Sequence, residues 1–264
     1  MTFLAYIKQM LADELNELGF KYCGTKNDYH GPKWYKLIDD MFYLQVWARN
    51  LGYGFIEIWF SIDSLLGDKL SNTPFQHNLA RLMTQELLNE GKAVGPLGGF
   101  VLRFLNDNEK NIEWWLERGR RSFALARPIL ESVYDFESCL AAKQRAGYAE
   151  LYFHGRELLG REYTPDDYAE FPPLDVFFIL CYLERFDDAA EYIQRYMNGM
   201  ARSNPNDIQI LEEDARIYSP YMEMAKNREV EKIRTMMIEN YNTNCDILEE
   251  RHGIKIDRSR FALK

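Results

Sequence analysis

The sequence predicts an α+β protein: a small antiparallel β-meander of three or four strands packed by helices, followed by a mostly α-helical bundle. Apolar and polar residues alternate with a persistent period of two only between Lys33 and Ile62. Around this stretch, apolar residues recur mainly at the three- and four-residue spacing of amphipathic helices. From Asp135 onward the pattern is helical, interrupted by glycine and proline.

The chain opens with a predicted amphipathic helix over residues 2–18. Thr2 can cap its first turn, because a threonine hydroxyl accepts a hydrogen bond from a free backbone N–H. Gly19 is a natural stop, since glycine readily adopts the left-handed conformation that ends many helices. A short strand then begins near Phe20, and a polar loop over residues 24–32 leads into the meander.

Three strands make up the predicted meander, namely Lys33–Ile38, Met41–Arg49 and Tyr53–Ile62. We expect a two-residue turn at Asp39-Asp40 and a three-residue turn over residues 50–52. In this register one face is wholly apolar, with Tyr35 beside Leu44, while Trp34 lies on the opposite face.

The opposite face of the meander is the predicted binding site. It combines aromatic and polar side chains, a mixture that is enriched at binding surfaces. Its members are Tyr43, Gln45, Trp47, Arg49, Phe55, Glu57 and Trp59. Two interpretations stay open: a helix from elsewhere in the chain covers this face, or the face is free to bind a partner.

Two segments carry a resemblance to a known family. Leu18-Gly19-Phe20-Lys21 and the strand Phe42-Tyr43-Leu44-Gln45-Val46 resemble a bacterial family of unknown function, which is thought to include immunity proteins encoded beside polymorphic toxins. The resemblance spans residues 4–62 and implies binding to a protein, without catalytic residues.

Beyond the meander we expect helices over residues 73–89 and 109–126, with a fourth strand at 100–104 between them. Pro128 then breaks the chain, and we predict two domains, residues 1–130 and 131–264, which could share one core.

The second domain is a predicted bundle of helical hairpins. Further helices are expected over residues 136–146, 148–159, 174–185, 188–200, 207–218 and 222–251. The segment 183–192 resembles one tetratricopeptide-type helical pair, but no second copy follows at the repeat period.

The acidic charge of the chain bears on its partners. The net charge is −9: residues 1–135 carry 15 Lys and Arg against 17 Asp and Glu, and residues 136–264 carry 17 against 24. An acidic second half argues against nucleic acid or an anionic membrane as partner and favours a basic protein. No oligomeric state is indicated.

Four widely spaced cysteines without a Cys-x-x-Cys pair indicate free thiols in a reducing compartment. The chain lacks both a secretory signal pattern and an apolar run approaching the ~18 residues of a membrane span. We therefore expect a cytoplasmic protein.

Linear motifs for catalysis, metals or cofactors are absent from the sequence. The four histidines are isolated, and neither a nucleophile elbow nor a phosphate-binding loop occurs. We therefore expect neither a metal nor a cofactor. The favoured interpretation is a non-enzymatic, immunity-type binding protein that uses an acidic surface and the aromatic sheet face. The alternative is a hydrolase whose site, assembled where sheet and helices meet, would draw on Asp28, His30, Arg49 and Glu57.

Overall fold

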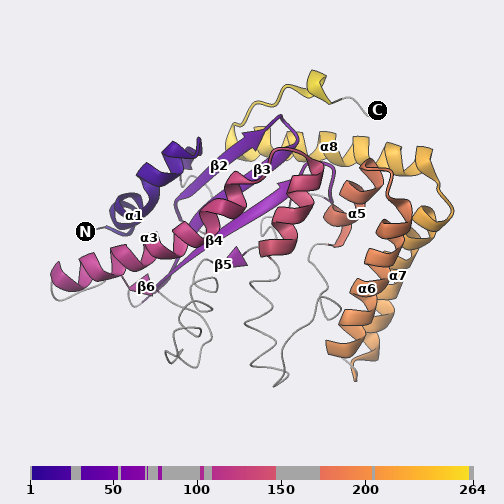
Figure 1. The fold of residues 1–264 in the computed structure, drawn as a ribbon, viewed down its shortest axis with the longest axis horizontal. Helices are drawn as coiled ribbons and strands as arrows, with labels where there is room; N and C mark the ends of the chain where they lie inside the picture. Colours follow the sequence, from indigo (N-terminus) through magenta and orange to yellow (C-terminus); the bar gives the residue numbers. More distant parts are fainter. Residues whose placement is uncertain are drawn as a thin grey trace. The chain divides into compact units, whose positions relative to one another are not determined.

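A computed structural model describes residues 2–24, 31–52, 55–68, 70, 77–78, 102–103, 109–146, 173–203 and 206–261. It confirms the α+β class (Figure 1). The strands are β1 (Lys21–Gly24), β2 (Lys33–Ile38), β3 (Phe42–Gly52), β4 (Phe55–Ser64), β5 (His77–Asn78) and β6 (Leu102–Arg103). The helices are α1 (Phe3–Glu17), α3 (Glu109–Glu131), a helix over 136–146, α5 (Pro173–Tyr182), α6 (Phe186–Ser203), α7 (Ile208–Lys226), α8 (Val230–His252) and a short 3-10 helix, Arg258–Arg260.

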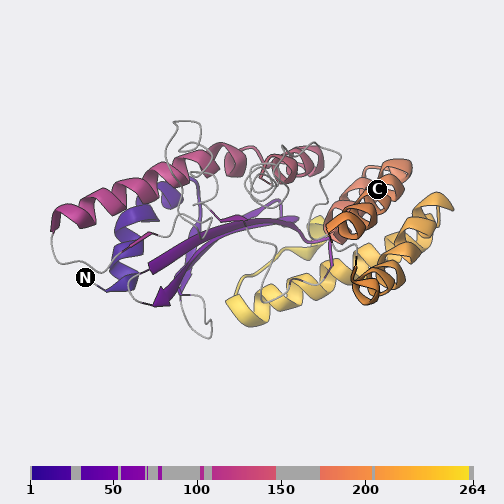
Figure 2. The ribbon, with the colours of Figure 1, turned by 90° about the horizontal axis from the view of Figure 1, so that it is seen from below.

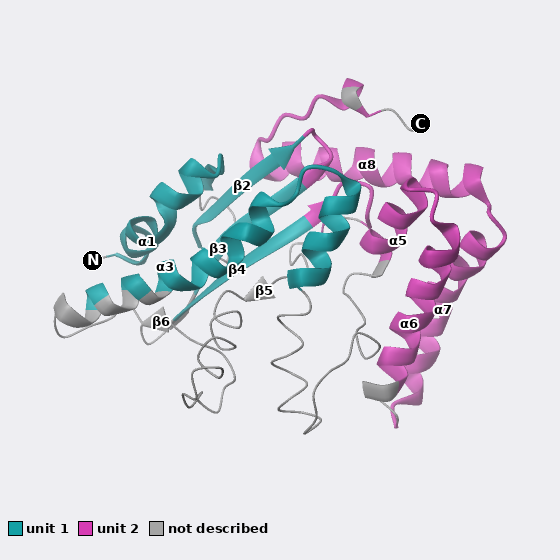
Figure 3. Cartoon of the chain, viewed as in Figure 1, with its two compact units in different colours: residues 1–38, 43–62, 76–162 teal, residues 39–42, 63–75, 163–264 magenta. Residues whose placement is uncertain are grey.

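The chain divides into two compact units, shown in Figure 3. Unit 1 contains residues 1–38, 43–62 and 76–162, and unit 2 contains residues 39–42, 63–75 and 163–264. This division places both sides of the predicted boundary at 130/131 in unit 1. Whether residues 1–130 and 131–264 form separate domains stays a prediction.

Helix α1 begins and ends as its sequence predicts. The Thr2 hydroxyl accepts a hydrogen bond from the Ala5 N–H at 3.3 Å. At the other end Gly19 has a positive φ of 80°, and the Gly19 and Phe20 amides donate to the carbonyls of Asn16 and Leu15. This pair of bonds is a Schellman motif, which needs a left-handed residue where Gly19 stands.

The sheet is antiparallel where its pairings are defined, with the strands in the order β1-β2-β3-β4-β5 and β6 also paired to β4. Strand β6 confirms part of the predicted fourth strand. The predicted helix over residues 73–89 is wrong at its two described residues, because His77 and Asn78 form β5 against β4. The rest of that helix lies outside the described residues, as does the helix expected at 148–159.

The predicted register between β2 and β3 is wrong by one residue. The Ala48 N–H donates to the Pro32 carbonyl at 3.1 Å, and the rings of Tyr35 and Tyr43 lie 6.3 Å apart. Tyr35 therefore shares a face with Tyr43, and Trp34 lies on the other face, because neighbouring residues of a strand point in opposite directions.

The turn between these strands explains the slip. Asp39 and Asp40 both have positive φ values, 49° and 55°, as tight hairpin turns often require. However, β3 begins only at Phe42, so Met41 belongs to the turn as a third residue. One additional turn residue shifts every pair in the ladder by one position.

The predicted turn over residues 50–52 is also wrong. These residues continue β3 to Gly52, and β4 starts at Phe55. Arg49 forms an ion pair with Glu57 at 2.9 Å. In the predicted register, four residues of β3, or about 13 Å, separate Arg49 from the residue that lies opposite Glu57. Such a separation does not fit the observed ion pair.

Helices α1 and α3 lie side by side over one face of the sheet (Figures 1 and 2). A Cβ at Gly119 of α3 would overlap the sulfur of Met10 in α1, so this glycine permits the close approach of the two helices. Lys8 of α1 lies over the ring of Tyr22, which packs against Trp34. The apolar, Trp34-bearing face is therefore the one that these helices cover.

In unit 2, α5 and α6 pack against each other and α7 packs against α6 (Figure 1). Ala189 and Ala190 of α6 are buried, as the resemblance to a tetratricopeptide-type pair implies. The break expected at Ser219-Pro220 is wrong: α7 runs through Pro220 to Lys226, and the chain turns at residues 227–229.

The side chain of Asn244, in α8, makes several hydrogen bonds to the segment that follows β4. Asn244 is fully buried, and its Oδ1 accepts a hydrogen bond from the Leu70 N–H at 2.7 Å. Its Nδ2 donates to the carbonyls of Leu65 and Gly67 at 3.1 and 3.2 Å. The amide thus uses both its donor and its acceptor capacity on backbone groups that the fold buries.

Two neighbouring contacts complete this attachment. Asn240, one turn earlier in α8, donates to the Leu66 carbonyl at 3.1 Å. The buried carboxylate of Asp175, in the first turn of α5, accepts the Ser64 N–H at 3.3 Å. Residues 64–68 and Leu70 are therefore fixed by hydrogen bonds to α5 and α8.

The substitution Asn244→Ala should destabilise the protein strongly. It leaves the Leu70 amide and the Leu65 and Gly67 carbonyls buried without partners, and each such group costs about 1–3 kcal/mol. The free energy of unfolding, measured by chemical denaturation, should therefore fall by several kcal/mol. The matched control is Asn242→Ala, because Asn242 is exposed on the same helix and its loss should change little. Equal effects of the two substitutions would contradict the role of Asn244.

Candidate functional site

The structure divides the predicted binding face into a covered part and an accessible part. Tyr43, Gln45 and Trp47 are 1%, 5% and 2% exposed. These three side chains are buried within the chain itself, and whether a helix covers them stays a prediction. They do not offer a free surface to a partner.

The accessible part of this face lies farther along the same strands. Glu57 accepts hydrogen bonds from Arg49 at 2.9 Å and from the indole nitrogen of Trp59 at 3.2 Å. Arg49 is exposed, while Glu57 and Trp59 are half-buried. Phe55 belongs to β4, but its side chain lies outside the described residues.

The residues of the alternative hydrolase site are only partly described. Arg49 and Glu57 come together as an ion pair, whereas Asp28 and His30 lie outside the described residues. Within the described ranges, histidine, cysteine, aspartate and glutamate side chains form no group of three or more that could hold a metal ion.

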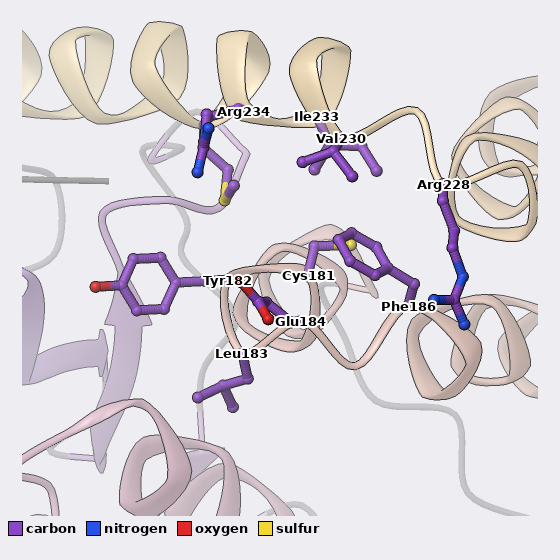
Figure 4. Close-up of a pocket in the computed structure, with 10 residues that line it drawn as sticks. Cys181, Tyr182, Leu183, Glu184, Phe186, Arg228, Val230, Ile233 and Arg234 are labelled. Atoms are coloured by element: carbon purple, nitrogen blue, oxygen red, sulfur yellow. The ribbon is translucent and has the colours of Figure 1, made fainter. Parts of the chain in front are cut away.

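A pocket of about 490 Å³ lies in unit 2, where the end of α5 and the start of α6 face the start of α8 (Figure 4). Its apolar lining includes Cys181, Phe186, Val230, Ile233 and Met237. No sequence pattern indicates this pocket, because its residues come from three separate helices and the turns between them.

Charged side chains stand at the rim of the pocket. Arg228, Arg234 and Glu184 line it, and Figure 4 shows the two arginines on opposite sides of the apolar residues. Arg228 pairs with Asp187 at 3.3 Å, and Arg234 pairs with Glu231 at 3.5 Å. Both pairs involve well-exposed carboxylates, and such surface pairs are weak.

The cysteine in the pocket is an apolar group at neutral pH. Burial raises the pKa of the Cys181 thiol to about 12, because a buried site disfavours the charged thiolate. The structure places none of the four cysteines in a disulfide. Cys181 therefore contributes an uncharged, apolar group to the wall of the pocket and does not supply a thiolate nucleophile.

A second feature of unit 2 is the surface of the first half of α7, which we call the α7 surface and define as residues 207–217. Three isoleucines stand out from it: Ile208, Ile210 and Ile217 are 68%, 37% and 39% exposed. The surface also carries four acidic residues and one arginine, namely Asp207, Glu212, Glu213, Asp214 and Arg216.

The inner side of α7 explains why these isoleucines stay outside. The Tyr218 ring packs edge-on against Tyr196 of α6, with centroids 4.9 Å apart. Asp214 lies half-buried on this side, and burial raises the pKa of its carboxyl group. Each residue advances about 100° around a helix, so Ile210 and Ile217 lie together beside this inner side, and Ile208 lies on the far side.

The sequence carried a signal of the α7 surface. Ile208, Ile210 and Ile217 do not lie on one apolar stripe, so a single packed neighbour cannot bury all three. At least one of the three isoleucines is therefore expected to be exposed, because the packing of α7 against α6 cannot bury all of them.

The burial difference between Trp47 and Trp59 gives a test of the divided sheet face. Trp47→Ala should lower the free energy of unfolding by about 3–5 kcal/mol, the usual cost of removing a large buried aromatic side chain. Trp59→Ala removes a half-buried ring and one hydrogen bond, so its cost should be clearly smaller. Chemical denaturation of both variants measures the difference, and a cost for Trp59→Ala equal to or above that for Trp47→Ala would contradict the assignment.

No known family model matches this chain, and searches of curated proteins and of solved structures also gave no match. Among the described helices, none is both long enough and apolar enough to cross a membrane.

Proposed function

We propose that this protein is a non-enzymatic, immunity-type binding protein whose α7 surface binds a basic protein partner. One observation carries the proposal: Ile210 and Ile217 are exposed on one side of α7, with Glu213 between them. Large exposed apolar side chains beside charged ones are a usual feature of interaction surfaces.

The spacing of these residues fits recognition by a groove. Ile210 and Ile217 are seven residues apart, which places them two helical turns, or about 10.5 Å, from each other along the same side. Helices that bind in hydrophobic grooves use apolar residues at this spacing as anchors. The partner should therefore offer an apolar groove that receives both isoleucines.

The charge of the α7 surface indicates the sign of the partner's charge. The exposed residues of 207–217 include three acidic side chains and one basic side chain, so a groove rimmed by lysine or arginine is complementary. Complementary charge mainly raises the association rate and is screened by salt. Binding should therefore weaken as the salt concentration rises.

Two of the sequence predictions also bear on this proposal, namely the family resemblance and the aromatic sheet face. The family resemblance of residues 18–21 and 42–46 supports an immunity-type role, since such proteins act by blocking a partner and need no chemistry of their own. Of the aromatic sheet face, the proposal retains only the exposed end at Arg49, Glu57 and Trp59 as a possible second contact. The hydrolase alternative stays a prediction.

Substitution of the two anchors tests the proposal. The tagged protein is incubated with extract of its native cell at low and high salt, and a retained basic protein is then purified and titrated. Ile210→Ser combined with Ile217→Ser should weaken binding by roughly tenfold to fiftyfold, since full burial of an isoleucine contributes about 1.5–3 kcal/mol and 37% and 39% of these two residues are still exposed. Because both residues are about three fifths buried in the free protein, circular dichroism and thermal unfolding first establish that the variant is folded at the temperature of the titration.

The matched control is Ile208→Ser, on the far side of the same helix. Ile208 is the most exposed of the three isoleucines, so its substitution reports on nonspecific hydrophobic binding by the helix. The proposal requires that this variant binds like the wild type. Equal losses from both variants, or a partner retained equally by the double variant, would contradict it.

A further inference from the structure

We propose that the pocket between α5, α6 and α8 binds a small amphipathic carboxylate, whose apolar part fills the pocket and whose carboxylate pairs with Arg234. This inference is independent of the α7 surface. It rests on the lining of the pocket, its volume and the different exposure of its two arginines.

The interior of the pocket suits an apolar chain. Ile233 and Cys181 are buried and form its floor, and Phe186 and Val230 extend the apolar wall to the rim (Figure 4). A ligand that covers these groups removes apolar surface from water, which is the main source of affinity in such pockets.

The volume limits the size of the ligand. About 490 Å³ lies within the usual range for small-molecule sites. It corresponds to roughly sixteen water molecules at about 30 Å³ each, so a chain of about a dozen non-hydrogen atoms fits inside. Decanoate has this size and the required chemistry.

Of the two arginines, Arg234 is the better partner for a carboxylate. The side chain of Arg234 is 37% exposed and that of Arg228 is 64% exposed, so an ion pair with Arg234 is less screened by water. The pair of Arg234 with Glu231 at 3.5 Å does not exclude a ligand, because a guanidinium carries five N–H donors and the Glu231 carboxylate is 88% exposed.

Calorimetric titration with decanoate tests the proposal on the full chain. The dissociation constant should be on the order of 0.1–1 mM for a ligand of this size. Arg234→Gln should weaken binding by roughly tenfold to a hundredfold, the range for a lost charge-assisted hydrogen bond. Arg228→Gln is the matched control and should stay within about threefold of the wild type, since its guanidinium is mostly in water.

A second variant tests the pocket itself without a change of charge. Val230 is partly exposed at the rim, so Val230→Phe should fill the pocket, preserve the fold by circular dichroism and abolish saturable binding. Two further ligands separate the contributions of chain and carboxylate: decyltrimethylammonium keeps the chain with the opposite charge, and acetate keeps the carboxylate alone. Both should bind at least tenfold more weakly than decanoate.

Several results would overturn the proposal. These are the absence of saturable decanoate binding, unchanged affinity in Arg234→Gln or Val230→Phe, and equal affinity for either comparison ligand. A loss in Arg228→Gln as large as that in Arg234→Gln would overturn the assignment of Arg234 as the carboxylate partner.

Discussion

The buried amide of Asn244 is the interaction on which the helical unit depends most. It satisfies backbone groups of the segment after β4 on both its donor and its acceptor side, and Asp175 holds the start of that segment from α5. An irregular segment can be buried only if its backbone groups find partners, because each unpaired group costs free energy. Asn244 thereby makes it possible to pack a loop between helices instead of leaving it in water.

This attachment also sets the position of the pocket. Ser64 contacts α5 through Asp175, and Leu66 and Leu70 contact α8 through Asn240 and Asn244, so the chain after β4 joins the two helices. Cys181 lies in the last turn of the helix that begins near Asp175, and Ile233 lies on the same helix as Asn244. The walls of the pocket are therefore extensions of the helices that the buried loop holds, whereas the α7 surface depends on the separate packing of α7 against α6 at Tyr196 and Tyr218.

The sequence predicted those features that depend on neighbouring residues. Thr2 and Gly19 bound α1 as expected, because capping is decided within one turn of helix. The strand β2 was also predicted with its observed bounds. The register was not, because the single residue Met41 joins the turn, and no local pattern distinguishes a two-residue from a three-residue turn between these aspartates. Pro220 shows a similar limit: α7 continues through a residue that usually ends a helix.

The features that join distant residues could not be predicted. Asn244 reads as one more polar residue on a charged helix, yet its partners lie more than 170 positions earlier in the chain. The aromatic sheet face was identified from alternation, but alternation cannot show that Tyr43 and Trp47 are covered. The pocket gathers residues from 181 to 237 without a motif, because its chemistry requires only apolar walls and one cation at the rim.

Native-state hydrogen exchange of the Leu70 and Ser64 amides tests the central claim most directly, because these two protons are held by Asn244 and Asp175. If the buried loop is fixed to the helices, both amides exchange as slowly as the core amides of α8, since they can open only when the unit opens. If Leu70 exchanges at the rate of an unstructured peptide while α8 stays protected, Asn244 does not hold this segment and the account is wrong.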